Sequence, residues 1–108
     1  AMAWLMLCAA GIFEIVWAAA MKQSEGFTRL GPTAVTIVAM IISFGFLAAA
    51  MRQLPLGTSY MIWTGIGAVG AFIYGVVALN EPANAMRIAA ALLIAYGIVL
   101  MKLATPAA

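Results

Sequence analysis

The sequence is short of charge and of the residues on which enzymes most often depend. Its 108 residues include five Lys or Arg and three Asp or Glu, and histidine is absent. Charged residues make up 7% and hydrophobic residues 68%, against about 25% and about 45–50% in an ordinary soluble domain. This composition excludes a soluble enzyme, a disordered segment and a small secreted domain, and leaves a small integral membrane protein.

Further absences narrow the function. A single cysteine, Cys8, excludes an internal disulfide. Because histidine is absent and no nucleophile is paired with a base, we expect neither a metal site nor catalysis, and no cofactor. The net charge of +2 is too small for a nucleic-acid-binding surface, which needs clustered basic residues.

Four long apolar runs predict an all-α membrane protein with a single domain, residues 1–108. A bilayer core about 30 Å thick needs about 20 apolar residues in each helix. Because the connections between the runs are short, consecutive helices should be antiparallel neighbours. The predicted spans are residues 3–21, 31–51, 57–79 and 85–103.

Basic residues are divided almost equally between the two predicted sides of the membrane. Lys22, Arg29 and Arg87 belong to one side, and Arg52 and Lys102 to the other. The distribution of lysine and arginine sets orientation, so this balance gives no strong preference. Either one orientation wins by a small margin, or the chain inserts both ways, which permits an antiparallel homodimer.

Small residues in the third and fourth runs bear on assembly and flexibility. Ala90 and Gly97 are seven residues apart and share a helix face. Because helices in lipid associate through small residues, we expect a dimer contact there, unless these residues only reflect how common Gly and Ala are in membrane helices. Gly65 and Gly67 predict a flexible point, since glycine weakens a helix locally.

Glu14 lies near the middle of the first run, where a carboxylate is costly. One explanation is a permanently protonated carboxyl that bonds a neighbouring helix. The explanation we favour is a binding site for a cation and for protons, because the interior of the spans holds no Lys or Arg that would attract an anion. Protons and the cation would then compete for one carboxylate, and a site that opens alternately to each side would exchange them.

Aromatic and polar side chains are expected around this carboxylate. Positions three or four apart share a helix face, which brings Trp17 beside Glu14. Tyr60 and Trp63 share a stripe of the third run, away from the interfaces where aromatic belts lie, and Ser43 is a polar group in the middle of the second. These side chains can donate hydrogen bonds to an ionised carboxylate while aromatic faces stack on a cation.

Three runs carry a family signature: residues 11–18 (GIFEIVWA), 26–29 (GFTR) and 54–67 (LPLGTSYMIWTGIG). They resemble the small multidrug resistance family, and the resemblance extends over nearly the whole chain. It implies an antiparallel homodimer of four-span, dual-topology subunits in the inner membrane of a bacterium. It also implies export of cations in exchange for protons through a pair of membrane glutamates.

Within that family, the sequence is most similar to the guanidinium exporter subtype, because of Trp17, Ser43 and the run 63–68. The resemblance implies that Glu14 binds both the substrate and protons. A pocket crowded by an indole should favour guanidinium or a small substituted guanidinium over a bulky cation. The implied supporting roles are hydrogen bonds to the carboxylate from Trp17 and Ser43, a place in that network for Tyr60, and pocket lining by Trp63 and, with less force, by Gly11 and Met40.

Three other functions stay open. A broad quaternary ammonium exporter would share the fold, a passive ion channel would conduct without a proton gradient, and a membrane chaperone or assembly subunit would transport nothing. Ser59 stands where a close relative often has Ala, and the sequence does not indicate what its hydroxyl does. Glu25 and Glu81 lie in predicted loops beside basic residues, which favours solvated charges over a second site.

Overall fold

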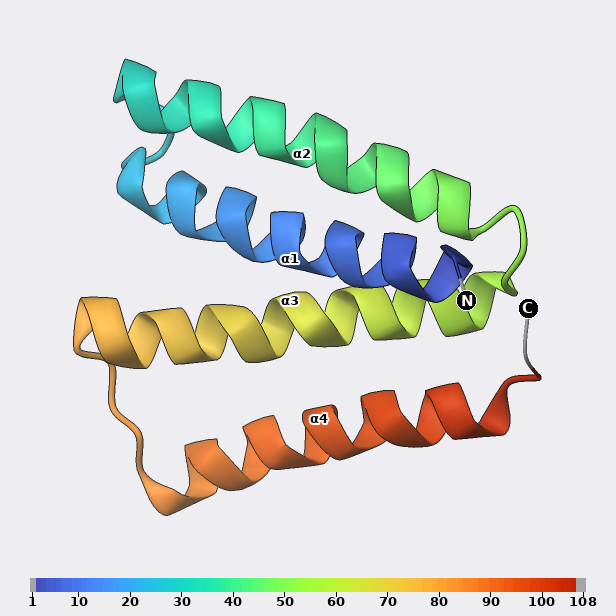
Figure 1. The fold of residues 1–108 in the computed structure, drawn as a ribbon. Helices are drawn as coiled ribbons and strands as arrows, with labels where there is room; N and C mark the ends of the chain where they lie inside the picture. Colours follow the sequence, from blue (N-terminus) through green and yellow to red (C-terminus); the bar gives the residue numbers. More distant parts are fainter. Residues whose placement is uncertain (1, 107–108) are drawn as a thin grey trace.

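A computed structural model describes residues 2–106 of the chain, and within that range the regular structure is entirely helical. Consecutive helices run in opposite directions, so α1 begins and α4 ends at the same end of the molecule (Figure 1). All four helices are long and apolar enough to cross a membrane, which confirms the prediction of an all-α protein with four spans. The helices are α1 (Met2–Gln23), α2 (Leu30–Ala50), α3 (Leu56–Leu79) and α4 (Ala85–Ala104).

The helix ends follow local backbone chemistry. Pro55 immediately precedes α3, where its missing N–H is not needed. Asn80 ends α3 in the left-handed conformation, with φ of 56°, which asparagine tolerates better than most residues. Asn84 begins α4 by accepting a hydrogen bond from the backbone N–H of Arg87 at 2.9 Å. The predicted spans therefore end within two residues of the helices, the largest difference being that α1 continues to Gln23.

A tight turn joins α1 to α2. Ser24 is fully buried, and its hydroxyl donates to the carbonyl of Met21 at 2.6 Å and accepts from the backbone N–H of Phe27 at 3.0 Å. Glu25, Gly26 and Phe27 all have positive φ angles. Such angles reverse the chain direction within a few residues, so α1 and α2 are held as antiparallel neighbours.

Helix α1 lies between α2 and α3 and packs against both (Figure 1). The main cluster of buried apolar side chains comes from the first half of α1, the last turns of α2, the α2–α3 connection and the first half of α3, so the core lies toward the end of the molecule where α1 begins. Glu14 is further along α1, beyond this core. The members of the core are Ala3, Leu7, Ala10, Leu47, Ala50, Leu54, Ile62 and Trp63.

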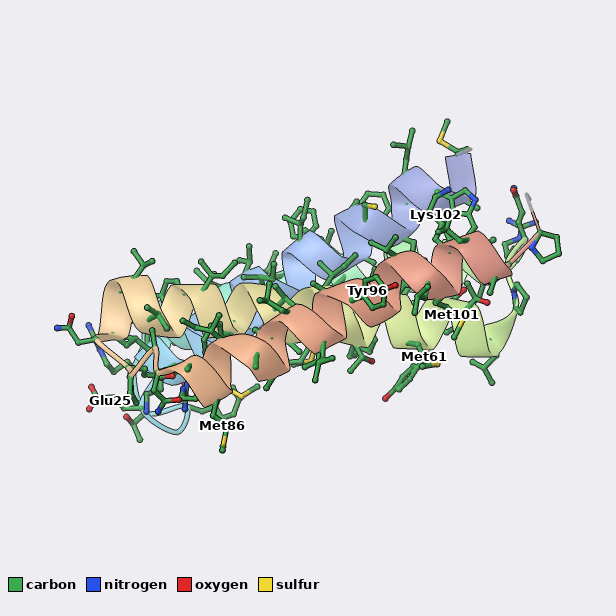
Figure 2. All side chains as sticks on the ribbon, turned by 90° about the horizontal axis from the view of Figure 1, so that it is seen from below. Glu25, Met61, Met86, Tyr96, Met101 and Lys102 are labelled. Atoms are coloured by element: carbon green, nitrogen blue, oxygen red, sulfur yellow. The ribbon has the colours of Figure 1, made fainter. Side chains whose placement is uncertain are left out.

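Helix α4 is different because it packs mainly against α3 and has no buried residue. Near its end, Lys102 lies over the ring of Trp4 in α1, 4.8 Å from the ring centroid. Figure 2 shows it in front of α3, with Met86 and Tyr96 on its surface, and these side chains are 84% and 63% exposed. Ala90 and Gly97, the predicted dimer contact, are both exposed in the single chain. Their place in a dimer stays a prediction.

The charged residues lie near the ends of the helices, apart from Glu14. The α1–α2 and α3–α4 connections lie at one end of the molecule, and the α2–α3 connection lies at the other end, where α1 begins and α4 ends (Figure 1). Glu25 forms an ion pair with Arg29 at 3.9 Å, and Glu81 forms one with Arg87 at 3.4 Å. The Glu25–Arg29 pair is largely exposed and the Glu81–Arg87 pair is partly exposed, in line with the expectation of solvated loop charges.

Candidate functional site

The glutamate in the interior of α1 is partly buried and incompletely bonded. The Oε1 atom of Glu14 is buried and has no hydrogen-bond partner among residues 2–106. The side chain lies against α3 at Gly67, where a Cβ atom would collide with the carboxyl group. An unpaired carboxylate inside hydrocarbon is costly, so this position suits a proton or a cation.

Trp17 lies one turn further along α1 and packs against α2. Its ring meets the ring of Phe44 edge-on, with 6.4 Å between centroids. The indole Nε1 is buried and also lacks a hydrogen-bond partner within the described part of the chain. The implied hydrogen bond from Trp17 to Glu14 is therefore not made in the single chain, where the indole ring packs on Phe44.

Ser43 joins three helices through one fully buried hydroxyl. Its Oγ donates to the carbonyl oxygen of Ala10 in α1 at 2.6 Å and accepts from Nε1 of Trp63 in α3 at 3.0 Å. A serine hydroxyl has one proton to donate. Because that proton is donated to Ala10, Ser43 does not donate to Glu14 in the single chain. The hydrogen bond from Ser43 to the carboxylate that the resemblance implies is therefore not made here.

The aromatic side chains predicted on α3 divide into a buried and an exposed member. Trp63 is 7% exposed, whereas Tyr60 is 53% exposed. Their ring centroids are 5.5 Å apart, and Phe44 packs edge-on against Trp63 at 5.8 Å. Phe44 thus touches both Trp17 and Trp63, and connects the two indoles into one aromatic surface beside the site.

The two weaker candidates are placed differently from each other. Gly11 is buried, and a Cβ atom there would meet Cγ2 of Ile66 at 2.6 Å, so this position faces α3 as a packing contact. Met40 is partly buried, one turn before Ser43 on α2. The part that each predicted residue plays in binding stays a prediction.

Two contacts of the site were not found from the sequence. Phe44 follows Ser43 directly, and neighbouring residues of a helix point to different faces, so spacing gave no reason to select it. The contact of Gly67 with Glu14 had a partial indication, since Gly67 belongs to the same stripe of α3 as Trp63. The site as a whole offers a buried anionic acceptor next to aromatic faces, which suits a cation that carries N–H donors.

Comparison with known proteins gives a family match and several similar relatives. Residues 2–94 match the family described as Small Multidrug Resistance protein. The guanidinium exporter of Escherichia coli (strain K12) is 53% identical over 104 residues, which are 96% of this chain and 99% of that protein. The guanidinium exporters of Proteus vulgaris and Salmonella typhimurium are each 51% identical over 104 residues, with 96% of this chain and at least 99% of each relative covered.

These relatives are bacterial and are named as exporters rather than as enzymes. Together with four apolar helices, they identify a multi-pass protein of the bacterial inner membrane. The resemblance based on the three sequence runs is confirmed. Because the match extends over most of the chain and the relatives are covered almost completely, the protein belongs to the small multidrug resistance family.

Proposed function

We propose that this protein exports guanidinium, or small substituted guanidinium cations, in exchange for protons. The observation that carries the proposal is the carboxylate of Glu14, which has a buried oxygen without a partner among residues 2–106 and lies in the interior of a membrane-spanning helix. Relatives named guanidinium exporter, at 51–53% identity over nearly the whole chain, support the choice of substrate.

Guanidinium fits the chemistry of the site. It is planar, carries N–H donors on every edge and pairs with a carboxylate in a forked geometry. Its weakly hydrated faces can stack on indole rings, and a cation over an aromatic face gains about 0.5–2 kcal/mol. Trp17 and Trp63, connected by Phe44, supply such faces. A quaternary ammonium ion has no N–H donor and would use only the aromatic part of the site.

Proton coupling follows from the use of one group for two ligands. A carboxylate that holds a proton cannot also bind the cation, so each ligand displaces the other. Alternating exposure of the site to the two sides of the membrane converts this competition into exchange. The inward proton gradient then drives export of the cation, and no cofactor takes part.

Assembly as an antiparallel homodimer of dual-topology subunits completes the proposal. Helix α4 packs mainly against α3 and leaves large apolar side chains exposed, and the basic residues are nearly balanced between the two ends. A Cβ atom added at Gly97 would have no contact within 4 Å in the single chain. Replacing Gly97 with Leu should therefore leave the single chain intact and disrupt the dimer, whereas Gly45→Leu on α2, which is equally open, should leave the dimer intact. The mass of the protein complex, measured in detergent, distinguishes a monomer from a dimer. A Gly97→Leu variant that is still a dimer would contradict the predicted contact.

The transport activity is tested with purified protein in liposomes. We expect labelled guanidinium to accumulate when the interior is acidic, and the accumulation to stop when the pH gradient is dissipated. Equal uptake without a gradient would indicate a channel, and no uptake would favour a chaperone or assembly subunit. Stronger transport of tetraethylammonium than of guanidinium would indicate a quaternary ammonium exporter. Each of these three results contradicts the proposal.

A further inference from the structure

The contact between α1 and α3 depends on glycines that receive side chains from the other helix. Gly67 of α3 receives the side chain of Glu14, since a Cβ atom at Gly67 would collide with Oε1 and Cδ and would lie 2.8 Å from Cγ. Gly70 of α3 receives Ile15. Neither position on α3 therefore has room for even one methyl group unless the facing side chain of α1 moves.

The contact at Gly67 is flanked on both sides by packed apolar contacts. On one side, Gly11 of α1 receives Ile66, with 2.6 Å between an added Cβ atom and Cγ2. On the other side, Gly70 receives Ile15. Because these contacts hold α1 and α3 together, a methyl group at Gly67 would be accommodated by the flexible end of the glutamate rather than by separation of the helices.

We propose that Gly67 is a positioning residue for the substrate site, because the absence of its side chain fixes the place of the Glu14 carboxylate. The inference rests on the proposed function and identifies a further determinant of affinity at the same site. Guanidinium binds a carboxylate through two parallel hydrogen bonds, which require the carboxylate to be correctly placed relative to the aromatic faces that stack on the cation. A displaced carboxylate can keep its charge and still lose this fit.

Two positions supply matched controls for a Gly67→Ala variant. Gly45 lies inside α2 with no atom within 4 Å of an added Cβ, so Gly45→Ala makes the same chemical change in open space. Gly70→Ala makes the same change in the α1–α3 contact, and its added methyl meets Ile15 instead of the carboxylate. If the glycines of α3 acted mainly by keeping that helix flexible, Gly70→Ala would lower affinity as much as Gly67→Ala.

The decisive measurement combines Gly67→Ala with Glu14→Asp. Aspartate is shorter by one methylene, so its carboxyl group withdraws from the added methyl. We expect Gly67→Ala to weaken guanidinium binding to the full chain, measured by calorimetry, by about tenfold or more, and Gly45→Ala to leave it unchanged. Adding Glu14→Asp should then restore part of the affinity, although the same substitution in the wild-type chain should reduce it.

Three results would overturn the proposal. The first is an unchanged affinity for guanidinium in Gly67→Ala. The second is a double variant whose fold-loss in affinity equals the product of the fold-losses of the two single variants. The third is a lower unfolding temperature for Gly67→Ala with no recovery of binding by Glu14→Asp, because the helices would then have moved instead of the carboxylate.

If the wild-type chain binds no guanidinium, the proposed function fails and the position of the carboxylate is still measurable. The NMR signal of the Glu14 carboxyl carbon should shift in Gly67→Ala and stay in place in Gly45→Ala. A carboxyl signal that is the same in all three chains would refute the positioning role by itself.

Discussion

The three glutamates of this chain occupy two contrasting regions. Glu25 and Glu81 lie in connections between helices, each paired with an arginine at 3.9 or 3.4 Å and at least partly exposed. Glu14 lies in the interior of α1, with a buried carboxylate oxygen that has no partner among the described residues. The same side chain is thus solvated and paired in one region and buried and unpaired in the other. Burial without a partner is costly for a carboxylate, which is the basis of the proposal that Glu14 binds a cation and protons.

The region around Glu14 also differs from the hydrogen-bonded core beside it. Ser43 uses both its donor and its acceptor, with Ala10 and Trp63 as partners at 2.6 and 3.0 Å. Glu14 and Trp17 each leave a buried polar atom unused within residues 2–106. We infer that the Ser43 network is structural in this conformation and holds α1, α2 and α3 together beside the candidate site.

The largest effect should come from removing the charge of the buried carboxylate. Glu14→Gln keeps the size and shape of the side chain but can neither bind a cation by charge nor exchange a proton. We expect proton-driven guanidinium uptake into liposomes to fall to the background of empty liposomes. Glu25→Gln, a matched change in the α1–α2 connection, should transport like the wild type. Substantial uptake by Glu14→Gln would contradict the prediction that transport requires the buried glutamate and not the exposed one.

The next effect concerns the hydrogen-bonded core. Ser43→Ala removes the bond to Ala10 and leaves the buried Nε1 of Trp63 without its acceptor. We expect a loss of about 1–2 kcal/mol in the free energy of unfolding, measured in mixed micelles. Ser59→Ala is the control, because the Ser59 hydroxyl is equally buried but unpartnered in the described chain, so its removal should cost less. Equal losses would show that the Ser43 bonds do not stabilise the fold.

Selectivity should depend on the indole beside the carboxylate. Trp17→Gly removes an aromatic face and opens the space that the ring fills against Phe44. We expect the preference for guanidinium over tetraethylammonium in transport to fall about tenfold, equivalent to about 1.4 kcal/mol. Trp17→Phe, which keeps an aromatic ring, should retain more of the preference. Unchanged selectivity in Trp17→Gly would count against the proposed substrate.

The helical architecture, and the place of Glu14 inside a membrane-spanning helix, could be predicted from the sequence. Long apolar runs ended by proline and charge determine where helices cross a bilayer, and an acidic residue such as Glu14 inside such a run is conspicuous because it is costly. These are properties of one helix in a bilayer. They do not depend on how the helices pack against one another.

The contacts between helices could not be predicted in the same way. Ser43 was expected to donate a hydrogen bond to the carboxylate, but it donates to the carbonyl oxygen of Ala10. Which acceptor the hydroxyl reaches depends on how closely α1 and α2 pack, and the sequence does not give that distance. Phe44 joins the two indoles from a position that helical spacing did not select. Between Arg87 and Lys102, helix α4 has no charged residue, so its composition did not show that α3 would be its main neighbour. Packing in lipid follows shape more than hydrophobic pattern, which explains these gaps.

The smallest effect is expected from the ion pair at the start of α4. This pair tests the opposite case to Glu14, a glutamate that has a partner and should not take part in transport. Glu81 and Arg87 are 42% and 40% exposed and 3.4 Å apart, and exposed pairs of this kind contribute at most about 1 kcal/mol. Glu81→Gln should therefore change the free energy of unfolding by less than this amount, and guanidinium transport should stay at the wild-type rate. A loss of transport in this variant, measured beside Glu14→Gln, would mean that the loop carboxylate belongs to the transport pathway. The functional distinction between the paired and the unpaired glutamates would then be wrong.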